Sequence, residues 1–248
     1  MTPRPLDAQE QENPFALSVG DLMAALLLVF VLLLSATLLL IKEDEERTVS
    51  LIEEYEALQD SLYTDLQDEF EGDLERWDAE LDRATLSLTF REPDVLFEQG
   101  RADVRPSFAA ILADFFPRYV RILRRDSYRG SIEEIRIEGH TSSEWFAGAD
   151  PEVSYLQNME LSQDRTRSVL RYVLDTVPDG EPRDWTRTHL TANGLSSSQP
   201  VLIDGAEDPA ASRRVEFRVR TDAERQLREI LDELGGAPVA EAARPTSP

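Results

Sequence analysis

A single carboxylate, Asp21, lies in an otherwise uncharged stretch of residues 15–41. Desolvation favours the neutral form of a carboxylate, so a carboxylate in such a stretch can take up and release a cation near neutral pH. Ser18 and Asp21 also have the spacing of a capping box, in which an acid three residues into a helix accepts hydrogen bonds from free backbone N–H groups. Residue chemistry alone leaves both roles open, ion carrier and helix cap.

The residues that follow Asp21 predict a membrane-spanning helix. Residues 22–41 are 20 uncharged residues, and at about 1.5 Å per residue such a helix crosses the roughly 30 Å hydrocarbon core of a bilayer. The preceding residues 1–14 are net acidic and no Ala-x-Ala site follows the apolar run, which favours an uncleaved anchor over a signal peptide. We therefore expect a tail over residues 1–14 and a transmembrane helix over residues 15–41.

An acidic segment with a helical apolar stripe comes next. Residues 43–82 contain 17 acidic residues and only two basic ones. Their apolar side chains recur at spacings of three and four, at Leu51, Tyr55, Leu58, Leu62, Leu66, Phe70, Leu74, Trp77 and Leu81. This periodicity predicts a helical stalk over residues 42–84, paired in parallel with a second copy of the chain. The alternative is one amphipathic helix that lies against the following domain.

The remainder of the chain predicts an α+β domain over residues 85–221. The expected strands are 85–90, 132–138, 188–192 and 214–220, and the expected helices are 106–123 and 158–176. Their order along the chain is β-α-β-α-β-β. An amphipathic helix is expected over residues 222–234, and residues 235–248 contain too few large apolar groups to pack.

Composition and residue types argue against nucleic-acid binding, a metal site and catalysis. A net charge of −23 disfavours nucleic-acid binding. His140 has only one other histidine in the chain, His189, and no clustered partners in the sequence, so we interpret it as structural and expect no metal site. The sequence offers neither a convincing nucleophile and base nor a Gly-rich phosphate loop, so we do not expect an enzyme.

Two sets of residues resemble known families. The segment VGDLMAAL at 19–26 resembles the start of the single transmembrane helix in the MotB family of ion-driven stators. The segments IEGHT at 137–141, NMELSQDR at 158–165 and SRRVE at 212–216 resemble the motifs of OmpA-like peptidoglycan-binding domains. The resemblance covers about residues 15–31 and 90–220, and the combination implies a B-type stator subunit with an OmpA-like β-α-β-α-β-β domain.

The MotB resemblance implies the surroundings of the ion-carrying residue. Asp21 matches the carboxylate that carries a proton or sodium ion, at the interface between a homodimer of B-type helices and a ring of A-type membrane subunits. No other cofactor is implied. The N-terminus would lie in the cytoplasm, the single helix in the bacterial inner membrane, and the C-terminal domain in the periplasm on peptidoglycan.

The OmpA-like resemblance implies a binding site at Ser142, Asn158, Leu161 and Arg165. The planar guanidinium of Arg165 matches a carboxylate such as that of a diaminopimelate stem peptide. As a lone helix residue, Arg165 could instead pair with Asp164 or Asp175. Leu161 could equally belong to the core, and Asn158 could cap its helix.

One position departs from the OmpA-like pattern. Ser142 stands where the family has an Asp for an ammonium group, and Glu144 is the nearby candidate substitute. The variant GHTSSEW at 139–145, with the acidic stalk, looks more like the ZorB-type B subunits of Zorya anti-phage defence systems than a flagellar stator. A flagellar stator and a passive membrane-tethered wall anchor without ion flux are the alternatives.

Overall fold

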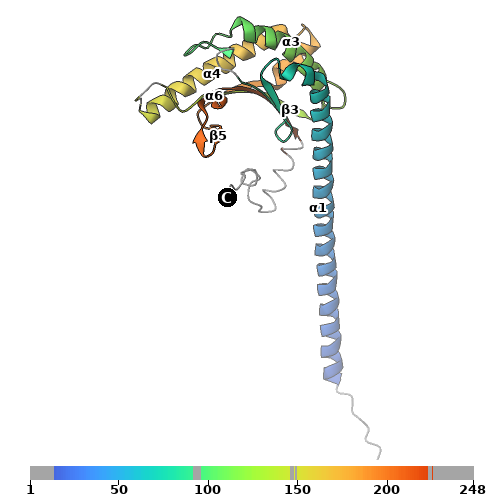
Figure 1. The fold of residues 1–248 in the computed structure, drawn as a ribbon. Coiled ribbons are helices and arrows are strands. Elements are labelled where there is room, and N and C mark those ends of the chain that lie inside the picture. The colour runs from blue at the N-terminus through green and yellow to red at the C-terminus, as the bar shows by residue number, and fades with distance from the viewer. Residues whose placement is uncertain (1–13, 92–95, 146–147, 149, 223–224, 226–248) are drawn as a thin grey trace, which may run out of the picture. The chain divides into compact units, whose positions relative to one another are not determined.

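The computed structural model describes residues 14–91, 96–145, 148, 150–222 and 225 (Figure 1). The chain divides into two compact units, residues 1–50 and residues 51–248. Residues 1–13, most of the helix expected over 222–234, and the segment 235–248 lie outside the described residues. The predictions made for them stay predictions.

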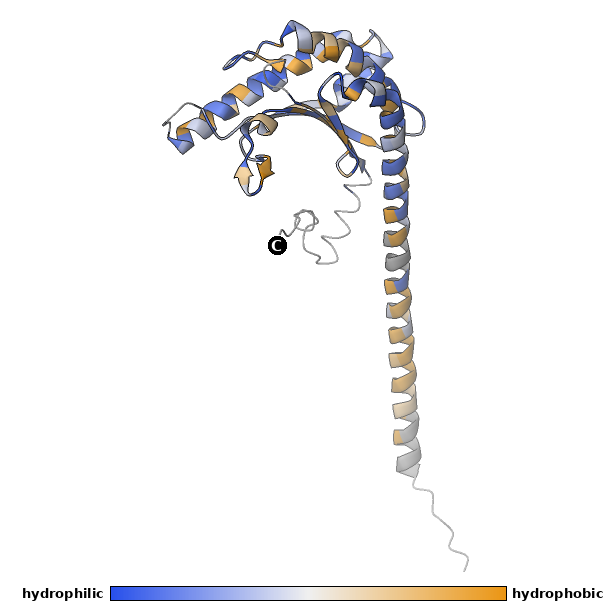
Figure 2. Ribbon diagram, in the orientation of Figure 1, coloured by the Kyte–Doolittle hydropathy of each residue, from blue (hydrophilic) through white to orange (hydrophobic). Residues whose placement is uncertain are grey.

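The first unit contains the N-terminal part of helix α1 (Pro14–Leu74). Pro14 suits the first turn, because its missing N–H would have no partner within a helix. Residues Leu22–Leu39 are long and apolar enough to cross a membrane, by length and composition, and their side chains are exposed. Figure 2 shows this stretch of α1 in the colours of apolar residues.

The start of α1 corrects one of the two interpretations of Asp21. A capping box would place Ser18 just before the helix and Asp21 in its first turn. Instead α1 begins at Pro14 and has no acidic residue in its first turn. Asp21 is seven residues into the helix, about 10 Å along its axis at about 1.5 Å per residue. A capping role at this helix start is therefore wrong, while the side chain of Asp21 is not among those described.

The second unit is built on a five-stranded sheet with the strand order β1-β2-β7-β3-β4. The strands are β1 (Ala79–Asp82), β2 (Ser87–Phe90), β3 (Ile132–His140), β4 (Leu190–Ser196) and β7 (Val215–Thr221). β3 and β4 are parallel, and the other neighbours are antiparallel. A separate hairpin consists of β5 (Leu202–Ile203) and β6 (Ala206–Glu207).

The helices of this unit are α3 (Pro106–Leu123), α4 (Pro151–Thr176), α5 (Glu181–His189) and α6 (Pro209–Ser212). α3 and α4 lie on one face of the sheet (Figure 1). The apolar residues of β3 and β7 alternate with polar ones and are buried, whereas most of the intervening side chains are only half-buried. The predicted α+β class and its β-α-β-α-β-β order are confirmed, with β1, α5, α6 and the β5–β6 hairpin as additions.

Two predicted boundaries are corrected. α4 begins at Pro151, seven residues before the predicted start at 158, and Asp150 caps it by accepting hydrogen bonds from the backbone N–H groups of Glu152 and Val153. The strand expected over 188–192 is β4, which begins at Leu190 because the preceding residues form α5.

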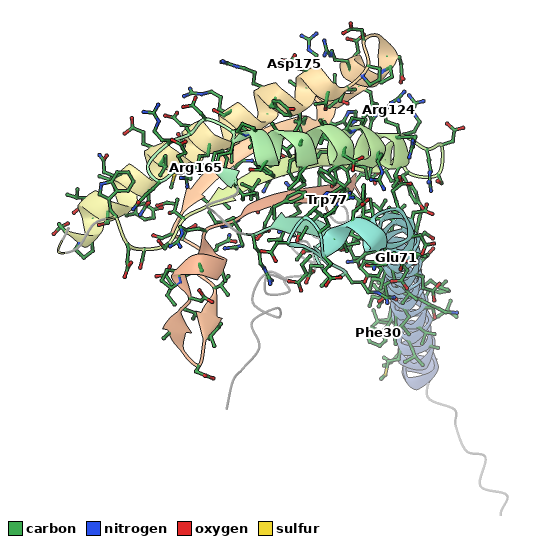
Figure 3. All side chains as sticks on the ribbon, turned by 45° about the horizontal axis from the view of Figure 1, so that its top comes forward. Phe30, Glu71, Trp77, Arg124, Arg165 and Asp175 are labelled. Carbon is green, nitrogen blue, oxygen red and sulfur yellow. The ribbon has the colours of Figure 1, made fainter. Side chains whose placement is uncertain are left out.

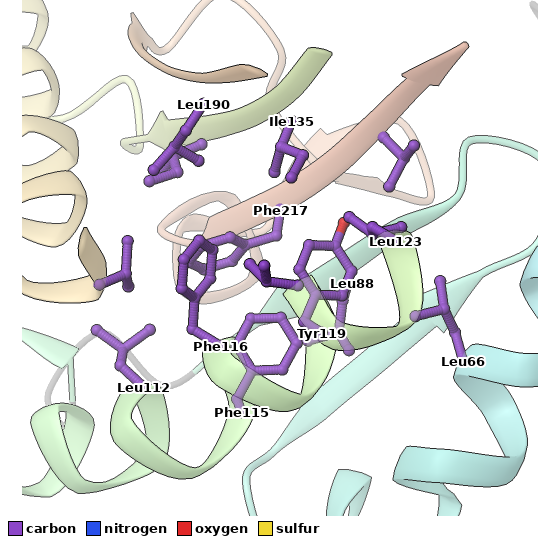
Figure 4. Packing of buried hydrophobic residues seen from close by; sticks show 14 of the residues in the cluster. Leu66, Leu88, Leu112, Phe115, Phe116, Tyr119, Leu123, Ile135, Leu190 and Phe217 are labelled. Carbon is purple, nitrogen blue, oxygen red and sulfur yellow. The ribbon is translucent and has the colours of Figure 1, made fainter. Parts of the chain in front are cut away.

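The acidic segment predicted to be a separate stalk over 42–84 belongs largely to the domain. Leu62, Leu66 and Phe70 are fully buried in the hydrophobic core that α3 and the sheet share, and Figure 4 shows Leu66 beside the α3 side chains. The Phe70 ring centroid lies 5.3 Å from that of Phe115 on α3. β1 then adds residues 79–82 to the sheet. The predicted boundary at residue 85 is wrong, because the apolar stripe is buried within its own chain, as the alternative interpretation expected.

Ion pairs line the same contact. Arg118 on α3 lies 2.8 Å from Glu69 (Nε to Oε1) and 2.7 Å from Asp73 (Nη1 to Oδ2), and it also donates to the backbone oxygen of Glu69. The Tyr128 hydroxyl donates to Asp65 at 2.6 Å. Several acids of the segment are therefore partners of α3 and of the turn that follows it.

Candidate ligand pocket

A cavity of about 450 Å³ opens where the loop after β3 meets α4. It is lined by Phe97, Gln99, Gly100, Thr141, Ser142, Glu144, Trp145, Asn158, Leu161, Arg165 and Arg213. All four residues predicted to form the binding site, Ser142, Asn158, Leu161 and Arg165, are in this lining. Segments far apart in the sequence thus meet at one cavity, and Figure 3 labels Arg165 on α4 at this place.

Arg165 is the most buried charged group of the cavity, with 9% of the residue exposed. Its Nε donates to the backbone oxygen of Arg101 at 2.9 Å, and its Nη2 donates to that of Glu98 at 3.3 Å. Its guanidinium carbon lies 4.8 Å from the centroid of the Phe97 ring. These contacts hold the guanidinium plane in place without neutralising it.

No carboxylate of the described residues pairs with Arg165. The two acids considered from the sequence have other partners, since Asp164 pairs with Arg167 and Asp175 lies 3.8 Å from Arg183. Burial, with a further contribution from the positive charge of Arg213, lowers the pKa of Arg165 to about 10. The guanidinium is still charged at neutral pH, so the pocket contains a positive charge without a counter-ion in this part of the chain.

Asn158 shapes the pocket through the backbone of the loop after β3. Its Nδ2 donates to the backbone oxygen of Ser142 at 3.0 Å and to that of Glu144 at 3.4 Å. The possibility that Asn158 caps its helix is wrong, because α4 begins seven residues earlier. On the other side of the loop, the backbone N–H of Ser143 donates to Glu207 of β6 at 2.9 Å. The loop is therefore fixed from both sides.

Comparison with known proteins places this architecture in a family. The chain is 42% identical over 229 residues to the Zorya protein ZorB of Escherichia coli, covering 92% of this chain and 97% of that protein. The chain belongs to the ZorB family. The resemblance to ZorB-type subunits inferred from the GHTSSEW variant is thereby confirmed.

Solved structures give weaker matches to this ZorB-family chain. A putative MotB-like protein from Desulfovibrio vulgaris is 26% identical with a TM-score of 0.49, covering 70% of this chain and 98% of that one. The cell wall anchor of the type VI secretion system from Pseudomonas aeruginosa is 24% identical with a TM-score of 0.44, covering 63% and 97%. No protein-family model matches the chain.

Two glycines allow α4 to lie close to the sheet and so set the position of Arg165. A Cβ on Gly194 of β4 would lie 2.3 Å from the backbone nitrogen of Gln163, and one on Gly139 of β3 would lie 2.6 Å from Cγ2 of Thr166. Both distances are shorter than a side-chain contact permits. Glycine is therefore required at both positions for α4 to pack this closely against the sheet.

A buried titratable cluster adjoins the pocket in this ZorB-family domain. The Nε2 of His140 lies 3.9 Å from Glu138 and 3.7 Å from Glu216, and neither ring nitrogen has a hydrogen-bond partner among the described residues. The expectation that His140 has no clustered partners is wrong, because strand pairing brings Glu138 opposite Glu216. These three side chains could together hold a metal ion. Both carboxylates already have arginine partners: Arg214 lies 2.5 Å from Glu216, and Arg136 lies 3.5 Å from Glu138.

Burial determines the protonation of this cluster. Desolvation, with the positive charge of Arg214, lowers the pKa of His140 to about 3, so the imidazole is neutral at neutral pH. Burial and the negative charge of Glu216 raise the pKa of Glu138. Both pKa shifts are toward the neutral form of the group, which is the direction that desolvation imposes.

Sequence reasoning did not assign six of the lining residues to the site: Phe97, Gln99, Gly100, Thr141, Trp145 and Arg213. Arg213 belongs to the SRRVE segment, but two adjacent arginines gave no sign of which one faces the cavity. The structure separates them, because Arg214 pairs with Glu216 whereas Arg213 lines the pocket. Phe97 lies in no expected element; it pairs with Val104 as an isolated bridge, and its buried ring packs against Phe108 at 6.0 Å between centroids.

Proposed function

We propose that this chain is the peptidoglycan-anchored B subunit of an ion-driven inner-membrane motor that serves Zorya-type anti-phage defence. The observation that carries the proposal is the 42% identity to ZorB along 92% of the chain, which includes both the membrane helix and the domain. In this proposal the chain forms a homodimer surrounded by A-type membrane subunits. Its N-terminus lies in the cytoplasm and its C-terminal domain in the periplasm.

Asp21 carries the ion, most simply a proton, in this mechanism. It lies within α1, one residue before the stretch Leu22–Leu39 that is apolar enough to cross a membrane. Neutralising a carboxylate lowers the free energy of moving it past apolar surface, so ion binding becomes coupled to motion of the A-type ring. The domain holds the dimer to the wall through the pocket that contains Ser142, Asn158, Leu161 and Arg165.

The test is ion flux with and without the carboxylate. The full chain and its A-type membrane partner are reconstituted in proteoliposomes, and Asp21→Asn is compared with Asp21→Glu and with Asp44→Asn, which removes a charge from α1 outside the apolar stretch. Phage protection is measured in cells at matched membrane levels. We expect Asp21→Asn to abolish flux and protection while Asp44→Asn preserves both.

A passive membrane-tethered wall anchor is the competing outcome. It predicts that Asp21→Asn leaves phage protection intact and that none of the variants, nor the native chain, conducts ions. Flux without phage protection, together with rescue of swimming in a stator-deficient host, would instead point to a flagellar stator.

A further inference from the structure

The charges that line the pocket are unequal. Arg165 and Arg213 contribute two guanidiniums, and Glu144 is the one carboxylate among the described lining residues. The two guanidiniums are close enough for Arg213 to lower the pKa of Arg165. Neither forms an ion pair with a carboxylate in the described part of the chain. The pocket wall is therefore net positive.

The buried side of the pocket has unused hydrogen-bond donors. A guanidinium has five N–H donors, and Arg165 spends two of them on backbone oxygens. The unused donors and the positive charge of Arg165 favour a ligand that brings acceptors and negative charge. A carboxylate supplies both and matches the planar fork of an arginine.

The one negative charge of the pocket wall is exposed to solvent, whereas the Arg165 guanidinium is buried. Glu144 is exposed, and Ser142, which stands where OmpA-like domains have an acid, is neutral and buried. An ion pair between exposed groups changes affinity by at most about fivefold, whereas a buried hydrogen bond to a charged group changes it by about 10- to 100-fold. An ammonium group bound at Glu144 would thus add little to a carboxylate bound at Arg165.

We infer that this pocket selects its wall ligand by a free carboxylate, bound by Arg165 and Arg213, and that it is nearly indifferent to the ammonium group beside that carboxylate. The inference rests on the proposed wall anchoring and specifies its ligand. A pocket with one guanidinium and one buried acid would need both groups of a zwitterion. Here the loss of the acid at Ser142 and the second guanidinium at Arg213 move the selection to the carboxylate.

Three synthetic stem tripeptides separate the two groups. The first ends in diaminopimelate, the second has its distal carboxylate amidated, and the third has its distal amine replaced by hydrogen. Binding to the full chain in detergent is measured by titration calorimetry. We expect amidation to weaken binding about 10- to 100-fold and removal of the amine to weaken it less than about fivefold.

Variants assign these effects to residues. Arg213→Gln should weaken binding of the diaminopimelate peptide about tenfold or more while leaving the amidated peptide unchanged, and Glu144→Gln should change binding less than about fivefold. Arg167→Gln is the matched control for Arg213→Gln, because Arg167 is an exposed arginine of α4 that pairs with Asp164 and does not line the pocket. Circular dichroism and thermal unfolding confirm that each variant is folded.

Sedimentation with isolated cell-wall sacculi distinguishes failure of the inference from failure of the anchoring. Binding to sacculi with no effect of amidation, or a tenfold loss on removal of the amine or in Glu144→Gln, overturns the inference alone. No binding to sacculi or to any of the three peptides overturns the proposed wall anchoring, and this inference with it.

Discussion

Replacement of Leu66 by alanine should destabilise the domain by about 3–4 kcal/mol. Leu66 is 0% exposed and lies in the core between the C-terminal part of α1 and α3. The change removes three carbon atoms at about 0.8 kcal/mol each, or about 2.4 kcal/mol, and the cavity left behind adds to this value. Ile52 lies on the same helix with 36% exposure, so Ile52→Ala should cost less than about 1 kcal/mol.

Urea unfolding of the full chain in detergent, followed by tryptophan fluorescence, measures this difference. Trp77 is a suitable reporter, because it is buried with its ring centroid 5.9 Å from that of Phe70. Self-association is measured in parallel by analytical ultracentrifugation. An unchanged free energy of unfolding in Leu66→Ala, together with weaker self-association, would refute the intramolecular packing and restore the paired stalk expected from the sequence.

Two further predictions concern the sheet beneath the pocket. Acidification from pH 6.5 to 5.5 should lower the free energy of unfolding by about 1 kcal/mol, because the pKa of His140 is lowered to about 3 and only the unfolded chain, with a histidine pKa of about 6.5, then takes up a proton. Urea unfolding at each pH should show a smaller slope in His140→Asn. Glu138, whose pKa is raised, contributes with the opposite sign, because its carboxyl holds a proton more tightly in the folded chain than in the unfolded one. Gly194→Ala should destabilise by about 1–3 kcal/mol, since its Cβ would collide with the backbone of Gln163. Gly130→Ala, which meets open space, should leave the thermal midpoint nearly unchanged, and equal midpoints for the two variants would contradict the close packing of α4.

Local sequence patterns predict those helices and strands whose apolar residues recur at the spacing of the element. α3 runs over Pro106–Leu123 as expected, because a proline suits its first turn and its apolar residues recur at helical spacing. α4 was predicted to begin too late, since its first turns expose Val153, Tyr155 and Leu156 and show no apolar face. The Asp150–Pro151 pair was the available signal for its start.

The stripe of α1 shows what periodicity cannot decide. Spacings of three and four state that one face of a helix is buried, but they do not state against what. Leu62, Leu66 and Phe70 would suit a partner helix as well as they suit α3. The short strand β1 was missed for a related reason, because four residues with two acids are recognised as a strand only through their pairing with β2.

The motif positions Ser142, Asn158, Leu161 and Arg165 all line one cavity, and their role in binding stays a prediction. The charges of that cavity were not predictable from the motifs. Which groups stay without partners depends on tertiary contacts that no motif encodes. The ion pair between Arg214 and Glu216 and the cavity position of Arg213 are of this kind.

Strand register connects the buried cluster to the pocket. The backbone N–H of His140 donates to the backbone oxygen of Arg214 at 3.0 Å, and that of Thr141 donates to Ser196 at 2.9 Å. The pocket loop therefore leaves β3 at a point fixed by both neighbouring strands, and Arg213 is one residue from one of these bonds. The close approach of α4 to Gly194 sets the distance between this helix and the sheet. Arg165 on α4 and Arg213 before β7 thus reach the cavity from segments that the same sheet positions. A substitution that shifts the sheet should then weaken carboxylate binding and stability together, whereas Arg213→Gln should weaken binding alone.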